Sequence, residues 1–452
     1  MLTQISVENF KSFHKMTKFT MISSTKIRSK TNHRIQVGSH TRLLKHAIVY
    51  GANASGKTNL VDFFRFFKAT LETGLPVWSA RNFCRCSEDN EKKPSTFEIQ
   101  FSMDGKFYAY GFSAVLMNRL VTGEWLYELY QNGSSRCIFE REHMSKPELD
   151  QSVSLTKEER MRFDTYATDF EDNMTGLFLA EMNRGKKFPA DSNLQVFQTV
   201  YDWLSNHIII FTPHSRLTNF QYYYDTDTLA LINDLIRTFD TGISSIRIEE
   251  IDLNDLSKML PEQIFQDVKE KVGKHMSGSG VTYFRMSGRT GNSFFNIEAN
   301  ENEEPKITTI KMRHGKSIYD FEFRDESDGT RRLFDLMDML LMKQDDTVFI
   351  VDELERSLHP KLTERFLRLF DEFHEDDRTQ LIFTTHESSI MDQELFRRDE
   401  IWFIERDENN VSSIYSLDRF KERYDKKLSK AYLEGRYGAI PVFKQFSFRK
   451  GE

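Results

Sequence analysis

Apolar residues along the chain alternate between the spacing typical of strands and the spacing typical of helices. A buried stripe at i, i+4, i+7 and i+11 predicts one helix, with Leu60, Phe64, Phe67 and Leu71 on its apolar face. Further helices are expected near 330–342 and over 361–370. Short apolar runs predict strands at 2–7, 47–50, 347–351, 380–384 and 400–404. Strands that alternate with helices predict an α/β fold.

The middle of the chain follows other patterns. Residues 96–101 and 106–112 alternate with period 2 and are joined at Asp104-Gly105, which predicts a β-hairpin. From about 138 to 240 the pattern is mostly helical and polar, with a capped helix start at Thr156, and a mixed region continues to about 325. We therefore expect three domains, namely an N-terminal lobe at 1–137, a mainly helical, partner-binding insertion at 138–312 and a C-terminal lobe at 313–452.

Composition favours a folded protein outside the membrane. Hydrophobic residues make up 39% of the 452 residues, which is too apolar for a disordered chain. No apolar run approaches the roughly 20 residues of a membrane helix. The N-terminus has no secretory signal, so we expect a cytoplasmic protein without a membrane partner. Cys84, Cys86 and Cys137 are interpreted as free thiols, because three cysteines make no disulfide framework and Cys84-x-Cys86 lacks the second ligand pair of a zinc site.

Charge is distributed unevenly along the chain. The net charge of −7 argues against a protein whose whole surface coats nucleic acid. Residues 9–61 nevertheless contain ten Lys and Arg and no Asp or Glu. Such a stretch favours phosphates, either of a nucleotide or of DNA. Alternatively, it is a solvated edge whose balancing acids lie elsewhere in the fold.

The loop after the strand at 47–50 carries a phosphate-binding motif. The segment Gly51-Ala-Asn53-Ala-Ser55-Gly56-Lys57-Thr58 matches G-x4-G-K-[ST] between an apolar strand and an amphipathic helix. Its glycines let backbone N–H groups surround phosphates, and the helix N-terminus adds the positive end of its dipole. We expect Lys57 to reach the β and γ phosphates of ATP and Thr58 to ligate Mg²⁺.

Two later strands also end in polar residues. The strand at 347–351 is followed by Asp352 and Glu353, and a P-loop fold uses such a pair to place one acid on Mg²⁺ and another beside the attacking water. Asp352 is therefore the predicted metal ligand and Glu353 the predicted general base. Without the P-loop, a strand that ends in a solvated turn would be the favoured interpretation of the two acids. The strand at 380–384 leads to His386, which we expect to hold the γ-phosphate.

The order of these motifs resembles the ABC-type ATPase heads of the SMC, RecF and OLD families. The resemblance is carried by the opening Val7-Glu-Asn-Phe-Lys-Ser-Phe13, by Asn59 directly after Lys57-Thr58, by Glu326-Ser327-Asp-Gly329-Thr330 before a helix, and by Ser357-Leu-His-Pro360 after Glu353. The third segment looks like a degenerate ABC signature and the fourth like a D-loop. The implied fold is a P-loop NTPase, an ABC-type ATPase head with a mostly helical insertion.

The same resemblance implies how the heads pair. In ABC-type heads the signature contacts the γ-phosphate held by the opposite subunit, so a head-to-tail dimer would enclose two ATP–Mg²⁺. The implied nucleotide-binding residues are Gly51, Asn53, Ser55, Gly56, Lys57, Thr58 and Asn59 of one head with Ser327 and Gly329 of the other. Ser327 has an alternative role as an ordinary helix N-cap. Gln100 is not assigned as the Q-loop residue, because nothing in the sequence ties it to the nucleotide.

Almost end to end, the chain also looks like the compact AAA ATP-binding proteins of prokaryotic abortive-infection and anti-phage systems, such as the lactococcal AbiL ATPase, the RloA type and the AriA ATPase of PARIS. The tail at 398–405 and 432–441 is similar to theirs, and its Gly435-Arg436-Tyr437-Gly438 segment has no assigned role beyond docking. The resemblance implies a switch that senses infection, with a phage-encoded trigger, and controls a separate effector such as a Toprim-type or other nuclease. The alternative is a RecF- or SMC-like DNA-repair ATPase that binds DNA directly.

Overall fold

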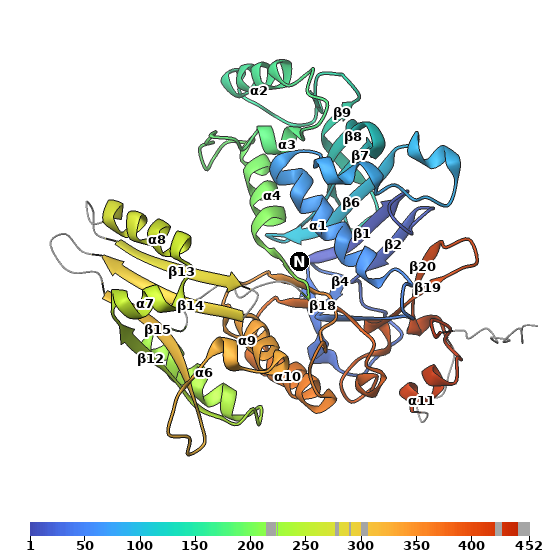
Figure 1. The fold of residues 1–452 in the computed structure, drawn as a ribbon. Helices are drawn as coiled ribbons and strands as arrows, with labels where there is room; N and C mark the ends of the chain where they lie inside the picture. The colour runs from blue at the N-terminus through green and yellow to red at the C-terminus, as the bar shows by residue number, and fades with distance from the viewer. Residues whose placement is uncertain are drawn as a thin grey trace, which may run out of the picture. The chain divides into compact units, whose positions relative to one another are not determined.

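The computed structural model describes residues 1–213, 223, 225–275, 280–288, 291–299, 306–420 and 427–441. The chain divides into two compact units, and Figure 1 labels many of their helices and strands. Unit 1 comprises Met1–His214, Lys343–Glu355 and His374–Glu452, and unit 2 comprises Ser215–Met342 and Arg356–Phe373. The chain therefore passes between the two units more than once. Within the described residues, no helix is both long and apolar enough to cross a membrane.

A six-stranded sheet lies at the centre of unit 1, and its strand order differs from the chain order. The order is β11 (Ile208–Phe211), β17 (Val348–Val351), β18 (Gln380–Thr385), β5 (His46–Tyr50), β19 (Ile401–Arg406) and β20 (Ser412–Ser416). The first five strands are parallel and β20 is antiparallel to β19. Parallel strands end at the same edge of the sheet, so the residues that follow β5, β17 and β18 are brought to one place.

A second sheet of unit 1 is antiparallel and has seven strands. Its order is β10 (Glu148–Leu149), β9 (Ser135–Glu142), β8 (Leu120–Leu129), β7 (Lys106–Val115), β6 (Ser95–Met103), β1 (Leu2–Glu8) and β2 (Thr17–Thr20). The predicted hairpin is present between β6 and β7, with φ of 51° at Asp104 and 76° at Gly105. Positive φ at both turn residues is what a tight hairpin needs, and Asp-Gly supplies it. Strands β3 (Arg34–Val37) and β4 (Thr41–Leu44) form a separate ribbon.

Helix α1 (Lys57–Thr73) contributes to the core with aromatic side chains. The predicted stripe is buried and is widened by further phenylalanines of the same helix. The ring of Phe66 lies 4.7 Å from Phe97 of β6, and that of Phe67 lies 5.4 Å from Phe112 of β7. The Nζ of Lys68 donates to the backbone carbonyl of Ile208 in β11. Helix α1 thus contacts both sheets of unit 1, which fixes the position of its N-terminus.

The remaining helices of unit 1 are α2 (Lys157–Asp169), α3 (Phe178–Glu181), α4 (Gln195–Asn206) and α11 (Leu428–Leu433). The predicted cap at Thr156 is present as a complete capping box with Glu159. After α11 the tail docks on β19 and β20. The buried ring of Tyr437 stacks on Phe403 at 5.6 Å, and its carbonyl accepts a hydrogen bond from the hydroxyl of Tyr415 at 2.7 Å. Tyr437 of the segment 435–438 is therefore part of the unit 1 core, whereas Arg436 is exposed.

Unit 2 contains a five-stranded antiparallel sheet and five helices among its described residues. The sheet order is β12 (Ile243–Ile251), β15 (Lys306–His314), β14 (Gly291–Ala299) and β13 (Gly280–Gly288), with β16 (Phe321–Glu322) paired to β15. The helices are α6 (Thr226–Arg237), α7 (Leu253–Met259), α8 (Glu262–His275), α9 (Asp328–Leu341) and α10 (Pro360–Phe373).

The region expected to be one mainly helical insertion, 138–312, is organised differently. Its first part belongs to unit 1 and ends in β11, which pairs with β17 in the parallel sheet. Its second part belongs to unit 2 and contributes four strands of the antiparallel sheet. The helical prediction is therefore incomplete, because the sequence pattern of 138–312 does not reveal which distant strands pair with one another.

Candidate active site

The loop between β5 and α1 is shaped by two glycines with no room for a side chain. A Cβ on Gly56, whose φ is 111°, would lie 2.4 Å from Ser412 Oγ and 2.8 Å from Ser12 Oγ. A Cβ on Gly51 would lie 2.5 Å from the carbonyl oxygen of Ile404. The loop therefore passes close to neighbouring chain segments before α1 begins at Lys57. Its backbone and the N-terminus of this 17-residue helix form a cradle suited to an anion.

Lys57 is buried and points back to its own loop. Its Nζ donates to the carbonyl oxygens of Gly51 at 2.7 Å and Ala52 at 3.0 Å, and lies 3.5 Å from His386 Nδ1. Burial lowers the pKa of this amine to about 8, although the carboxylates of Asp352, Glu355 and Glu353 act in the opposite direction. The ammonium is held by weak carbonyl acceptors, which a phosphate would replace with a stronger, charged partner.

Asp352 and Thr58, which the sequence analysis proposes as metal ligands, are hydrogen bonded to each other. Asp352 is buried at the end of β17, and its Oδ1 accepts a hydrogen bond from Thr384 Oγ1 at 2.6 Å. Burial raises the pKa of the Asp352 carboxyl, and hydrogen bonds from Thr384 and from the side chain of Thr58 oppose this rise. A carboxylate beside a hydroxyl is the hard oxygen donor set that Mg²⁺ prefers, so the residues present fit this ion.

Glu353 and His386 follow β17 and β18 and are held by neighbouring groups. Glu353 has a φ of 49°, and its N–H donates to Thr384 Oγ1 at 2.9 Å. The N–H of His386 donates to Glu355 Oε1 at 2.7 Å. Burial lowers the pKa of the His386 imidazole, and the nearby Lys57 charge lowers it further. The imidazole is therefore neutral at pH 7, where it offers one donor and one acceptor nitrogen.

These groups surround a pocket of about 560 Å³ in unit 1. It is lined by Asn53, Ala54, Gly56, Lys57, Thr58, Asn59, Glu353, His386 and Arg406. Seven of the predicted site residues are in this set. Gly51, Ser55 and Asp352 are buried and do not line the pocket. Gly51 shapes the loop, and Asp352 accepts a hydrogen bond from Thr58, which does line it.

Several residues of the site were not predicted. Arg406 at the end of β19 lines the pocket, and its Nη1 donates to the carbonyl of Ala54 at 2.9 Å. Asn59 Nδ2 donates to Ser12 Oγ at 2.6 Å, and Ser412 Oγ donates to the carbonyl of Ser55 at 2.5 Å. These contacts join residues far apart in the sequence. The only local signal was the position of Ser12 in the opening segment that resembles RecF-type heads.

The predicted signature residues Ser327 and Gly329 belong to unit 2, whereas the P-loop belongs to unit 1. Ser327 is the N-cap of α9, and its Oγ accepts a hydrogen bond from the N–H of Thr330 at 3.1 Å. The hydroxyl of Ser327 therefore acts as a helix N-cap, which is the alternative role that the sequence left open. A Cβ on Gly329 would lie 2.6 Å from the carbonyl of Ser357, so the predicted signature and D-loop approach each other closely. Gln100 bonds to Glu98 and does not line the pocket.

Comparison with known proteins identifies the type of fold. A family model described as "AAA domain, putative AbiEii toxin, Type IV TA system" matches residues 47–392. No curated protein matches the chain. Similar solved structures include an SMC head bound to the C-winged helix domain of ScpA, with 14% identity over 92% of this chain and 97% of that chain and a TM-score of 0.36. Another is the SMC head domain from Thermotoga maritima, with 14% identity over 92% and 98% and a TM-score of 0.33. The family match and the parallel sheet confirm an α/β P-loop NTPase fold.

Proposed function

The chain belongs to the AAA domain family whose model spans residues 47–392, and we propose that it is an ATP-binding and hydrolysing switch protein of a prokaryotic anti-phage, abortive-infection system. One observation carries the ATPase part of the proposal. Lys57, Thr58, Glu353 and His386 line one pocket beside the carboxyl ends of three neighbouring strands. That arrangement combines a phosphate cradle, a hydroxyl for a metal and a carboxylate for a water.

In this proposal Lys57 and the loop backbone bind the phosphates. The Nζ of Lys57 exchanges its bonds to the carbonyls of Gly51 and Ala52 for bonds to phosphate oxygens. Thr58 and Asp352 would hold Mg²⁺ through a hydroxyl and a carboxylate. Such an ion would supply positive charge beside the phosphates that these residues and Lys57 bind.

Glu353 then acts as the general base. Its carboxylate takes a proton from a water whose oxygen attacks the γ-phosphorus, while the bond from that phosphorus to the β-γ bridging oxygen breaks and ADP and phosphate leave. His386 and Lys57 donate to the γ-phosphate oxygens. Thr384 fixes the backbone of Glu353 and the carboxylate of Asp352 through one hydroxyl, so the base and the metal ligand keep a constant relation.

The proposed switch operates through pairing of two heads. Ser327 and Gly329 of one chain would contact the γ-phosphate held by Lys57 of the other, and hydrolysis would remove that contact. A γ-phosphate that bridges two subunits makes the dimer depend on the state of the nucleotide. The paired state would be passed to a separate effector, such as a Toprim-type or other nuclease, after a phage-encoded trigger. The AbiL, RloA and AriA types are the proposed relatives in this respect.

A second candidate is a RecF- or SMC-like ATPase that binds DNA directly. The observation that favours it is the basic stretch at 9–61, where Lys15, Lys18, Lys26, Arg28 and Arg42 are exposed. Other members of the stretch are engaged within the fold, since Lys11 pairs with Asp62 and Lys45 donates to the carbonyls of His374 and Glu375. Exposed cations of this kind would bind phosphates in a manner that weakens steeply with salt.

The two candidates are separated by a capture experiment. The Glu353→Gln chain is expressed from its native locus, purified with ATP, and analysed by mass spectrometry for bound proteins and by nuclease digestion for bound DNA. The control is the Lys57→Ala chain, which should not hold ATP and should recover only the background.

A stoichiometric nuclease or other effector, absent from the Lys57→Ala sample, is the result expected for the defence switch. Recovery of DNA and repair factors alone would replace that proposal with the DNA-repair one. Strong stimulation of hydrolysis by naked DNA, falling steeply with salt, would argue in the same direction.

A further inference from the structure

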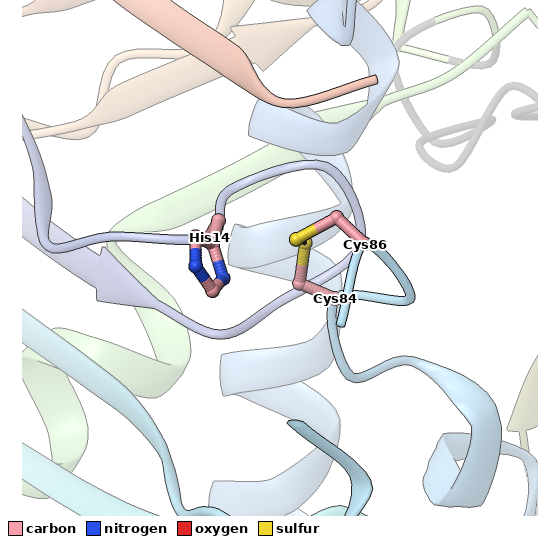
Figure 2. Close-up of side chains that lie close together, drawn as sticks. All are labelled: His14, Cys84 and Cys86. Carbon is pink, nitrogen blue, oxygen red and sulfur yellow. Dashed lines mark hydrogen bonds between the residues drawn. The ribbon is translucent and has the colours of Figure 1, made fainter. Parts of the chain in front are cut away.

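Two thiols and an imidazole meet outside the active site, in the loops that follow β1 and α1. His14, Cys84 and Cys86 each place a ligand atom within 4.8 Å of the other two (Figure 2). The two sulfur atoms are 3.3 Å apart and form no disulfide. The sequence interpretation rejected a zinc site because Cys84-x-Cys86 has no second cysteine pair. The fold supplies a third ligand from His14, which lies 70 residues earlier in the chain.

The loops that carry these side chains are held together by hydrogen bonds of their own. The N–H of Cys84 lies 3.1 Å from Asn9 Oδ1 and 3.3 Å from the Asn9 carbonyl. The side chain of Asn9 in turn donates to the carbonyl of Asn90 at 2.9 Å. Cys84 is only 1% exposed, whereas His14 and Cys86 are half-buried. The three ligand atoms are therefore preorganised by the fold and still reachable from solvent on one side.

Asn90 lies beside all three candidate ligand residues. Its buried amide Nδ2 donates to the carbonyl of Cys84 at 2.8 Å, which fixes the orientation of the amide. The same nitrogen lies 3.0 Å from His14 Nδ1 and 3.6 Å from Cys86 Sγ. An amide nitrogen only donates, so His14 Nδ1 accepts in this contact, and a metal bound at Nδ1 would replace it.

We propose that His14, Cys84 and Cys86 form a binding site for one thiolate-preferring divalent ion of the zinc class. Two thiolates and one neutral imidazole are typical zinc ligands, and their charge balances a 2+ ion once both thiol protons have left to solvent. No carboxylate belongs to the group, which disfavours Mg²⁺ and Ca²⁺. The partial exposure of His14 and Cys86 leaves the fourth tetrahedral position to water.

Such an ion would link two loops of unit 1. His14 lies two residues after Ser12, whose Oγ accepts a hydrogen bond from Asn59 of α1 and lies 2.7 Å from the Oγ of Ser412 in β20. The ion would fasten the segment 9–14 to the loop at 84–90 and thereby hold Ser12 in place. It would act independently of the proposed switch function.

The test uses the full chain, purified with reductant and without added metal, and Co²⁺ as a spectroscopic probe. The expected result is one Co²⁺ per chain with thiolate-to-metal charge-transfer absorption, which Zn²⁺ displaces. His14→Asn and Cys86→Ser, both at half-buried positions, should each weaken Co²⁺ binding by about tenfold or more. Cys137→Ser is the matched control, since Cys137 is also half-buried but lies outside the group, and it should bind as the unchanged protein does.

The proposal is overturned if the chain binds no Co²⁺ with thiolate absorption, or if both variants retain it at full affinity. A Cys84–Cys86 disulfide that forms in air despite excess Zn²⁺ would also overturn it. Circular dichroism of His14→Asn and Cys86→Ser checks that each variant is folded, so a loss of binding by either folded variant supports the site.

Discussion

At the scale of single residues, the site depends on one hydroxyl that joins two acids. Thr384 Oγ1 donates to Asp352 and accepts from the N–H of Glu353, and neither contact is visible in the sequence. Thr384→Val keeps the shape but removes both bonds. We expect the turnover rate to fall by about 10- to 100-fold while ATP affinity changes little, as for other residues that orient metal ligands. Thr384→Ser should restore most of the rate; equal rates for Thr384→Val and the unchanged chain would contradict this role.

Because the pKa of Lys57 is lowered, we expect ATP binding to depend on pH. Its pKa is lowered from 10.5 to about 8, so the ammonium loses its proton as the pH rises through 8. We expect ATP affinity to fall about tenfold between pH 7 and pH 9, as the protonated fraction does. Without nucleotide, the folded state gains stability between pH 8 and 10.5, where only the unfolded chain holds this proton. Calorimetric titration with ATP at several pH values measures the first effect, and an affinity that stays constant would contradict the assignment.

We expect the substitution of Gly56 by alanine to lower the stability of the fold by more than a positive φ alone would. Gly56→Ala combines a φ of 111° with a Cβ 2.4 Å from Ser412 Oγ. Gly105→Ala is the matched control, because Gly105 has a φ of 76° and nothing within 4 Å of an added Cβ. The control should lose about 1–2 kcal/mol, and Gly56→Ala should lose at least about 1 kcal/mol more. Thermal unfolding of both variants without nucleotide shows which variant loses more stability. If Gly105→Ala is as unstable as Gly56→Ala, the steric argument is refuted.

Much of the pocket was predictable at this scale, because the P-loop, Asp352 and Glu353 are coded by short local motifs. Arg406 and Ser412 were not predictable. They reach the loop between β5 and α1 because β19 pairs with β5 and β20 pairs with β19. No local sequence pattern predicts either pairing.

At the scale of elements, the local patterns were reliable and the long-range pairings were not. The stripe of α1, the Asp104-Gly105 turn and the capping box at Thr156 each follow from neighbouring residues. The antiparallel sheet of unit 2 was missed because β12 pairs with β15 across more than fifty residues. Pairing at that separation is fixed by packing rather than by local propensity.

The packing of the C-terminal tail on β19 and β20 leads us to expect that the tail stabilises unit 1. Tyr437→Ala removes a buried ring that stacks on Phe403, and we expect it to destabilise unit 1 by about 3–5 kcal/mol, as for other buried aromatic residues. Leu433→Ala is the control, because Leu433 is 65% exposed and its loss should stay within about 0.5 kcal/mol. Hydrogen exchange of α11 and residues 434–441 should rise in Tyr437→Ala alone. Unchanged exchange would show that the tail is not held by this ring.

At the scale of the whole molecule, an α/β P-loop NTPase fold is built from two compact units. Its two predicted nucleotide-contacting parts, the P-loop and the signature residues Ser327 and Gly329, belong to different units. The sequence predicted both motifs from their local spacing. It did not predict how the chain divides, since residues 343–355 of unit 1 lie between two segments of unit 2. Such an exchange of segments depends on which strands pair in the folded chain.

The most direct test of this account compares ATP binding with ATP hydrolysis in the unchanged chain and in Glu353→Gln, using Mg²⁺-ATP, filter retention of the nucleotide and release of phosphate. We predict that both chains retain ATP, that the unchanged chain releases phosphate, and that Glu353→Gln releases it at least about 100-fold more slowly because the general base is gone. Equal rates of phosphate release in the two chains, or no retention of ATP by the unchanged chain, would contradict the account.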